Sequence, residues 1–171
     1  MRNALASAGI VHLATHARMN PHNPMFSRIE LARGDGVSGA GDGRLEVHEI
    51  LRLRVGAGLV FLSGCETGVG PAWSTEFVRG DDYASLAQAF LFAGARSVVS
   101  TLWPIADDGA AEFATRFYTH LGTKAPPEAL AAAQRELLAG GSRSAPYYWA
   151  AYQVSGDGES TGLRTTRVAG P

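Results

Sequence analysis

Three short, mostly apolar runs constrain the fold of this chain more than any other feature. They occupy residues 10–15, 59–63 and 98–102, and glycine or proline lies beside each of them. Runs this short that are apolar on both faces are typical of strands buried inside a parallel sheet. Apolar residues recur at helical spacing in three segments, residues 83–93, 107–121 and 127–139. Strands that alternate with helices predict an α/β domain with a largely parallel sheet flanked by helices.

The rest of the chain divides into shorter elements at its glycine and proline residues. We expect Asp82 to cap the helix over 83–93, and Asp107 or Asp108 to begin the helix that follows the third strand. The further expectations are a helix over 2–8, a loop over 17–26, strands over 28–32 and from residue 44, a glycine-rich hairpin loop over 34–43, a short helix over 47–53, a long loop over 66–82, a last strand over 148–154 and a polar, disordered tail over 157–171.

Length and charge exclude several classes of function. A chain of 171 residues suits one domain, here residues 1–156. The net charge of −1 gives no electrostatic basis for binding nucleic acid or an anionic membrane. No apolar run approaches the length of a membrane-spanning helix, and the N-terminus does not resemble a signal peptide. One cysteine cannot form an internal disulfide, so we expect a cytoplasmic protein with a free thiol.

Cys65 and His16 are the strongest candidates for catalysis. His16 directly follows the run over 10–15, and Cys65 lies just past the run over 59–63, after Gly64; the carboxyl ends of parallel strands meet at one edge of the sheet. A thiol nucleophile needs a base within hydrogen-bond reach. Their separation, 65 − 16 = 49 residues, agrees with the caspase arrangement, in which the histidine lies about 50 residues upstream. A buried structural role is the alternative for Cys65, but Gly64 and Gly68 indicate an exposed turn.

Other polar residues carry weaker signals. His12 lies inside a strand, which favours a core histidine, whereas His22, His48 and His120 are expected at the surface. Asp107 follows the third strand, where a role at the start of a helix is the simpler interpretation. Trp103 either forms a pocket wall or packs in the interior. The sequence has no metal-binding pattern, because it lacks His-Glu-x-x-His and has no cysteine pair.

Several ordered blocks of sequence closely resemble the CHAT domain family, whose members are caspase-like domains. The blocks are residues 12–17 (HLATHA), 62–68 (LSGCETG), 91–104 (LFAGARSVVSTLWP), 117–118 (FY), 128–130 (EAL) and 148–152 (YWAAY). The resemblance spans about residues 10–156. It implies a caspase-like three-layer sandwich and a cysteine endopeptidase that needs no cofactor, with protein or peptide substrates.

The resemblance also implies roles for particular residues. His16 and Cys65 fall on the catalytic dyad. The backbone N–H groups of Ala17 and Cys65 fall on the oxyanion hole, although caspases have glycine where this chain has Ala17. Separases, which are similar, place an aspartate four residues after a strand-end tryptophan, in the pocket for a basic P1 side chain. Asp107 and Trp103 match that pair, which favours cleavage after arginine or lysine.

One departure from the family opens a different class of function. Caspase-like domains have one or two strands before the strand that carries the histidine, whereas only residues 1–9 precede it here. The first strands are therefore expected to be missing, and the strand over 10–15 to have an unpaired edge. The alternative to a peptidase is a catalytically inactive or partner-dependent module in protein–protein interaction or signalling. Domains of this family are often fused to tetratricopeptide repeats, so a repeat or other sensor domain is a possible partner.

Overall fold

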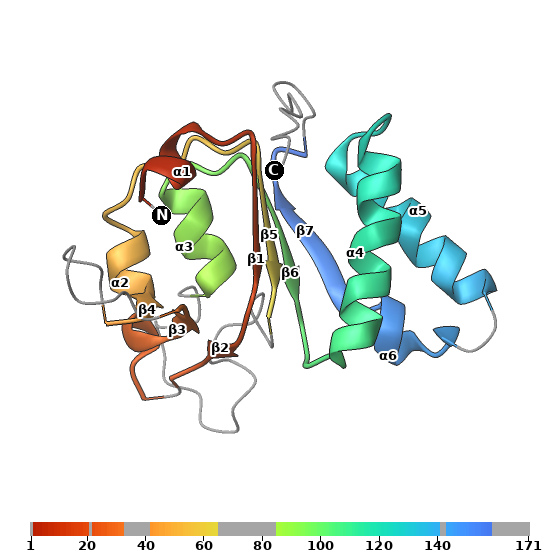
Figure 1. Cartoon of the computed structure of the whole chain (residues 1–171), viewed down its shortest axis with the longest axis horizontal. Helices are drawn as coiled ribbons and strands as arrows, with labels where there is room; N and C mark the ends of the chain where they lie inside the picture. The colour runs from red at the N-terminus through yellow and green to blue at the C-terminus, as the bar shows by residue number, and fades with distance from the viewer. Residues whose placement is uncertain (1, 21, 33–41, 65–84, 141–142, 159–171) are drawn as a thin grey trace.

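A four-stranded central sheet forms the middle of the molecule (Figure 1). The computed structural model describes residues 2–20, 22–32, 42–64, 85–140 and 143–158. The strands lie in the order β1 (Ile10–Ala14), β5 (Leu59–Ser63), β6 (Ser97–Thr101) and β7 (Tyr152–Gly156). The first three are parallel, and β7 is antiparallel to β6. The three apolar runs are thus neighbouring strands, and the predicted α/β class is confirmed.

Helices cover both faces of this sheet, which gives the three layers of a caspase-like sandwich (Figure 1). One face carries α1 (Arg2–Ser7), α2 (Val47–Ile50) and α3 (Leu86–Phe92), and the other carries α4 (Asp107–Leu121), α5 (Pro126–Ala139) and α6 (Pro146–Trp149). Side chains alternate between the faces along a strand. In β5, therefore, Val60 and Leu62 enter the core beneath α2 and α3, whereas Leu59 and Phe61 enter the core beneath α4 and α5.

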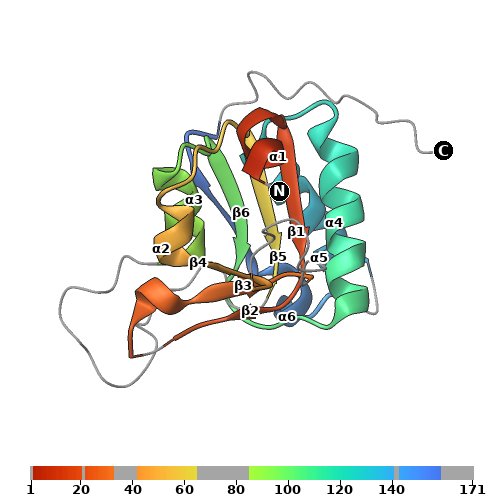
Figure 2. The same cartoon turned by 60° about the vertical axis from the view of Figure 1, so that its left-hand side comes forward.

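A small antiparallel sheet lies beyond the carboxyl end of β1 (Figure 2). It consists of β2 (Ala17–Arg18), β3 (Arg28–Glu30) and β4 (Arg44–Glu46), with the 3₁₀ helix η1 (Pro24–Phe26) before β3. The predicted hairpin of the second and third of these strands is confirmed. The prediction of a plain loop over 17–26 is wrong, because β2 pairs with β3 and Asn23 caps η1.

Two further predictions about element boundaries are wrong. Ser85, not Asp82, caps α3: its side chain accepts a hydrogen bond from the backbone N–H of Gln88, and the Gln88 side chain accepts one from the backbone N–H of Ser85. This capping box satisfies the first donors of the helix. The aromatic pair at 148–149 belongs to α6 and not to the last strand, because Pro146 occupies a first-turn position that favours a helix.

Strand β1 is the least covered of the parallel strands. Within the described residues it pairs only with β5, so its other edge is open. Its residues are half-buried or exposed, whereas all five residues of β6 are buried. The interior burial expected for residues 10–15 is therefore wrong, while the unpaired edge is present.

The C-terminal end of the described structure differs from the prediction of a disordered tail that starts at residue 157. Arg96 forms an ion pair with Asp157 at 2.8 Å, and Ser97 accepts a hydrogen bond from the N–H of Gly158. These two residues, predicted to begin the tail, therefore contact β6, and residues 159–171 lie outside the described part. Among the described helices, none has the length and apolar character needed to cross a bilayer.

Candidate functional site

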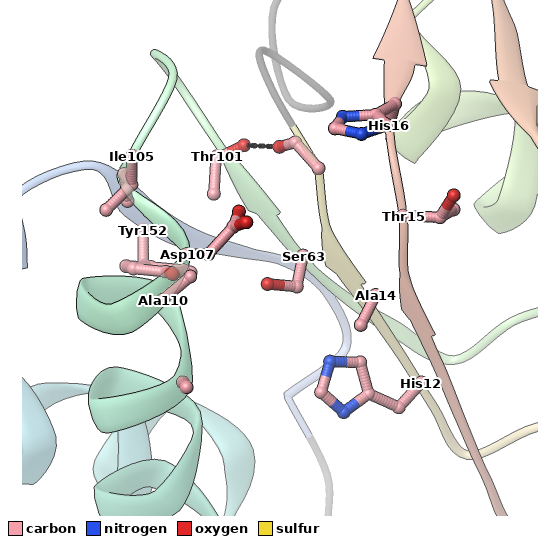
Figure 3. Close-up of a pocket in the computed structure, with 12 residues that line it drawn as sticks. His12, Ala14, Thr15, His16, Ser63, Thr101, Ile105, Asp107, Ala110 and Tyr152 are labelled. Atoms are coloured by element: carbon pink, nitrogen blue, oxygen red, sulfur yellow. Dashed lines mark hydrogen bonds between the residues drawn. The ribbon is translucent and has the colours of Figure 1, made fainter.

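A pocket of about 380 Å³ opens at the carboxyl ends of β1, β5 and β6 (Figure 3). The first turns of α4 and the start of β7 close its opposite side. Its lining residues are His12, Ala14, Thr15, His16, Ser63, Gly64, Thr101, Ile105, Asp107, Ala110, Ala111 and Tyr152. The structure thus brings together two of the predicted site residues, His16 and Asp107, although 91 positions separate them in the chain (107 − 16).

His16 lies two residues after the end of β1 and lines the pocket. It shares the pocket side with His12 and Ala14, as alternation along an extended chain requires. The small sheet anchors the backbone here: the Thr15 hydroxyl donates to the Glu30 carbonyl at 2.6 Å, and the Glu30 N–H donates to the His16 carbonyl at 2.8 Å. The imidazole is exposed, so it is open to a ligand in the pocket.

Gly64, the residue after β5, lines the pocket. The Thr101 hydroxyl donates a hydrogen bond to the Gly64 carbonyl, which joins the end of β6 to the segment after β5 (Figure 3). Thr101 is buried and Gly64 is half-buried, so the bond is partly shielded from water. Cys65 itself lies outside the described residues, and its contact with His16 stays a prediction.

Ala17, the other predicted contributor to the oxyanion hole, is the first residue of β2. It lies opposite Ile29 in an antiparallel pair. Because the Glu30 N–H bonds to the His16 carbonyl, the pair of Ala17 and Ile29 is of the non-hydrogen-bonded kind. The Ala17 N–H therefore points away from β3 and does not take part in that ladder. Its role in an oxyanion hole stays a prediction.

Asp107 is the first residue of α4, and its carboxylate faces the pocket (Figure 3). It is not the N-cap, because Ala106 occupies that position without a side-chain hydrogen bond. Asp107 is exposed, so its charge is available to a ligand. The interpretation that Asp107 lies at a helix start and the interpretation that it lines a pocket are compatible.

The neighbouring Asp108 has a different environment. Arg143 donates to its carboxylate at 2.7 Å and also pairs with Glu112 one turn later at 3.0 Å. The hydrogen bond from Arg143 holds the pKa of Asp108 below its ordinary value. Arg143 also lies over the Tyr148 ring, 5.3 Å from its centroid. These contacts fix the first turns of α4 against α6, and with them the position of Asp107.

Trp103 does not line the pocket. Its indole N–H donates to the Tyr147 carbonyl at 3.0 Å, and its ring packs against the core beneath α4 and α5. It therefore joins the segment before α4 to α6. Direct contact between Trp103 and a substrate stays a prediction, and the observed contacts are those of a packing residue.

The interpretation of His12 as a core residue is wrong. Its side chain is exposed and lines the pocket, because β1 is an edge strand of the described sheet. One side of the ring still packs on Phe61 and Tyr118, with centroids at 4.7 and 5.6 Å. Loss of water on that side lowers the pKa of His12. His12 is thus a second imidazole in the pocket, nearer its base than His16 (Figure 3).

Ser63 and Tyr152 are polar pocket residues that the sequence analysis did not single out. Tyr152 is only 3% exposed and stacks on Phe113 with ring centroids 3.7 Å apart. Burial raises the pKa of Tyr152 to about 12, an effect that the nearby Ser63 hydroxyl partly offsets. Ser63 could have been found from its spacing, since it lies two residues after Phe61 on the same face. Tyr152 had no comparable signal, because β7 is antiparallel and so its first residue, not its last, lies at the pocket edge.

Comparison with known families agrees with this architecture. The family model of the CHAT domain matches residues 1–157. The chain therefore belongs to the CHAT domain family, a caspase-like family. No curated protein matches the chain.

Proposed function

We propose that the chain is a cysteine endopeptidase domain in which Cys65 is the nucleophile and His16 is its acid/base partner. One observation carries the proposal: a single pocket holds His16, Asp107 and Gly64, the residue bonded directly to Cys65. The CHAT family match supports it, because the family is related to caspase-like cysteine peptidases.

The register of the two strands supports the pairing of His16 with Cys65. β1 and β5 are parallel, and Ala14 lies opposite Ser63. His16 and Cys65 each follow these partners by two positions (14 + 2 and 63 + 2). Neighbouring strands lie about 4.8 Å apart, so the segments that leave Ala14 and Ser63 begin close together, and both of these residues line the pocket.

The chemistry then follows that of a thiol–imidazole pair. The Cys65 sulfur attacks the scissile carbonyl, and the N–H groups of Ala17 and Cys65 stabilise the oxyanion. His16 takes the proton of the Cys65 thiol as the sulfur attacks and gives that proton to the leaving amine as the C–N bond breaks, so a thioester remains on Cys65. Water, deprotonated by His16, then attacks the thioester, which releases the acid and restores the thiol.

Asp107 gives this proposal its specificity. Of the residues that line the described pocket, Asp107 is the carboxylate, and no lysine or arginine is among them. A negative charge in a partly enclosed pocket attracts a basic side chain and rejects an acidic one. We therefore propose cleavage after arginine or lysine.

The second candidate is a non-catalytic or partner-dependent module. The open edge of β1 favours it, because the strand that carries His16 leaves backbone groups of the described sheet unpaired. A partner strand at this edge, from a fused sensor domain or another protein, would hold His16 more firmly.

Labelling of Cys65 separates the two candidates. The chain is treated with a peptidyl acyloxymethyl ketone that carries arginine at P1, and adducts are mapped by peptide mass spectrometry. The peptidase proposal expects an adduct on Cys65 that is lost in His16→Ala. Iodoacetamide serves as the matched reagent, because it reports access to the thiol without a peptide. Alkylation by iodoacetamide with no reaction of the peptidyl probe would favour the non-catalytic module.

A further inference from the structure

The Tyr152 hydroxyl is an unusual feature of the pocket wall. It is buried and has no hydrogen-bond partner of normal geometry among the residues that the structure describes. The Ser63 hydroxyl is close enough to affect its pKa but does not form a hydrogen bond of normal geometry with it. An unpaired buried hydroxyl is unfavourable, because folding removes its water without replacing it. Such groups are rare in native structures and call for an explanation.

The position of this hydroxyl suggests what could satisfy it. Tyr152 lies at the start of β7 and lines the same pocket as Asp107 and Ser63. In the close-up, its ring lies below Asp107 with the oxygen directed to the pocket interior (Figure 3). The pocket therefore offers a carboxylate from α4 and a buried phenol oxygen from β7, on two separate elements of one wall.

Tyr118 provides a comparison for Tyr152, because its hydroxyl is buried in the same way but does not line the pocket. The Tyr118 hydroxyl is also buried without a partner, and it belongs to the same side of the sheet. Burial raises the pKa of Tyr118 as well. Tyr118, however, is not among the residues that line the pocket. The two tyrosines thus form a matched pair that differs in access to a ligand.

We propose that Asp107 and Tyr152 together form a two-point site for a guanidinium group, so that the pocket selects arginine over lysine. This inference rests on the peptidase function proposed above and narrows its substrate class. The Asp107 carboxylate pairs with one edge of the guanidinium, and the Tyr152 oxygen accepts a hydrogen bond from a further N–H of the same group.

The geometry of the two basic side chains explains the selection. A guanidinium spreads five N–H donors over a rigid plane, so it can reach acceptors on two different elements at once. An ammonium is a compact point charge with three donors, and it satisfies the carboxylate without a fixed direction toward a second acceptor. A neutral apolar side chain would leave both Asp107 and Tyr152 without new partners.

The test compares Tyr152→Phe with Tyr118→Phe on matched peptide substrates that have arginine, lysine or leucine at P1. Each variant loses one unpartnered hydroxyl, so neither should lose folding stability, and thermal unfolding checks this. Tyr152→Phe should lower kcat/KM for the arginine substrate about tenfold, as expected for the loss of one hydrogen bond to a charged group. Its kcat/KM for the lysine and leucine substrates should change much less. Tyr118→Phe should leave all three unchanged. An equal loss for arginine and lysine in Tyr152→Phe would overturn the proposal.

A binding measurement separates this inference from the peptidase function. Butylguanidine and pentylamine, which differ in the head group, are titrated onto the Cys65→Ala chain and followed by calorimetry. Butylguanidine should bind more tightly, and Tyr152→Phe should remove that advantage. If no peptide is cleaved but this pattern appears, the guanidinium site stands and the peptidase proposal fails. If peptides are cleaved but both ligands bind equally, the guanidinium site fails alone.

Discussion

The two walls of the pocket differ in how many contacts hold them to the rest of the fold. The wall that carries His16 belongs to β1, an edge strand with half-buried and exposed residues, tied mainly to Glu30 of the small sheet. The wall that carries Asp107 belongs to α4, whose first turns Arg143 joins to α6 beside the fully buried β6. In the proposed peptidase, the comparison separates His16, the proposed acid/base residue on the loosely held wall, from Asp107, the proposed selector of the substrate on the supported wall.

The largest expected effect concerns the proposed dyad, of which His16 belongs to the loosely held wall. Cys65→Ala and His16→Ala should each lower kcat at least about 10³-fold for every P1 side chain, because the members of a dyad act as a unit. Steady-state hydrolysis of arginine, lysine and leucine substrates measures this.

His22→Ala is the matched control for His16→Ala, because His22 is an exposed histidine that does not line the pocket. It should leave turnover unchanged. Full activity in purified Cys65→Ala would refute the mechanism.

The supported wall should respond selectively. Asp107→Asn should lower kcat/KM for the arginine substrate about 30-fold or more, because losing a buried charge partner costs about 2–5 kcal/mol. The leucine substrate should change far less, and the rate at which iodoacetamide alkylates Cys65 should stay the same. Asp108→Asn, one residue along the helix, is the control, since Asp108 pairs with Arg143 and does not line the pocket. Preference for aspartate at P1 would overturn the assignment.

The difference in support between the walls is measurable without substrate. We expect amide hydrogens of β1 to exchange at least about 100-fold faster than those of β6, because weakly covered edges open locally with little free energy. Exchange followed by NMR or mass spectrometry provides the comparison. We expect a strand that pairs with the open edge, supplied by a longer form of the chain or by a partner, to slow exchange in β1 and raise turnover together. Equal protection of the two strands in the isolated chain would remove the basis of the comparison.

The sequence predicted where most strands and helices lie in both walls better than it predicted which of their residues are covered. β5, α4 and α5 were found within about two residues at each end, since their apolar spacing directly reflects burial. His12 was misjudged because periodicity shows that a strand is apolar but not whether a neighbour covers it. Tyr152 was missed because its place in the pocket depends on the reversed direction of β7, which only the assembled sheet reveals.

The smallest expected effect is on the pH dependence of stability, and it concerns one carboxylate on each side of the pocket. Ion pairs with arginine lower the pKa of Asp108 on α4 and of Glu30 on β3. A carboxyl whose pKa is lower in the folded than in the unfolded protein stabilises the fold above its unfolded pKa, and this stabilisation is lost as pH falls through the folded pKa. Asp108 is largely exposed, and the Glu30–Arg28 pair is only partly buried, so each effect is small. If α4 unfolds with the whole domain and the β1 side opens earlier, Asp108→Asn should lower global stability at pH 7 and lose that difference toward pH 3. Glu30→Gln should change global stability less at both pH values, while it speeds amide exchange in β1 and β3 at pH 7.

Urea denaturation at the two pH values, combined with exchange, measures both. Equal effects of the two variants on global unfolding would show that the walls form one cooperative unit and that the difference in support does not reach the level of folding.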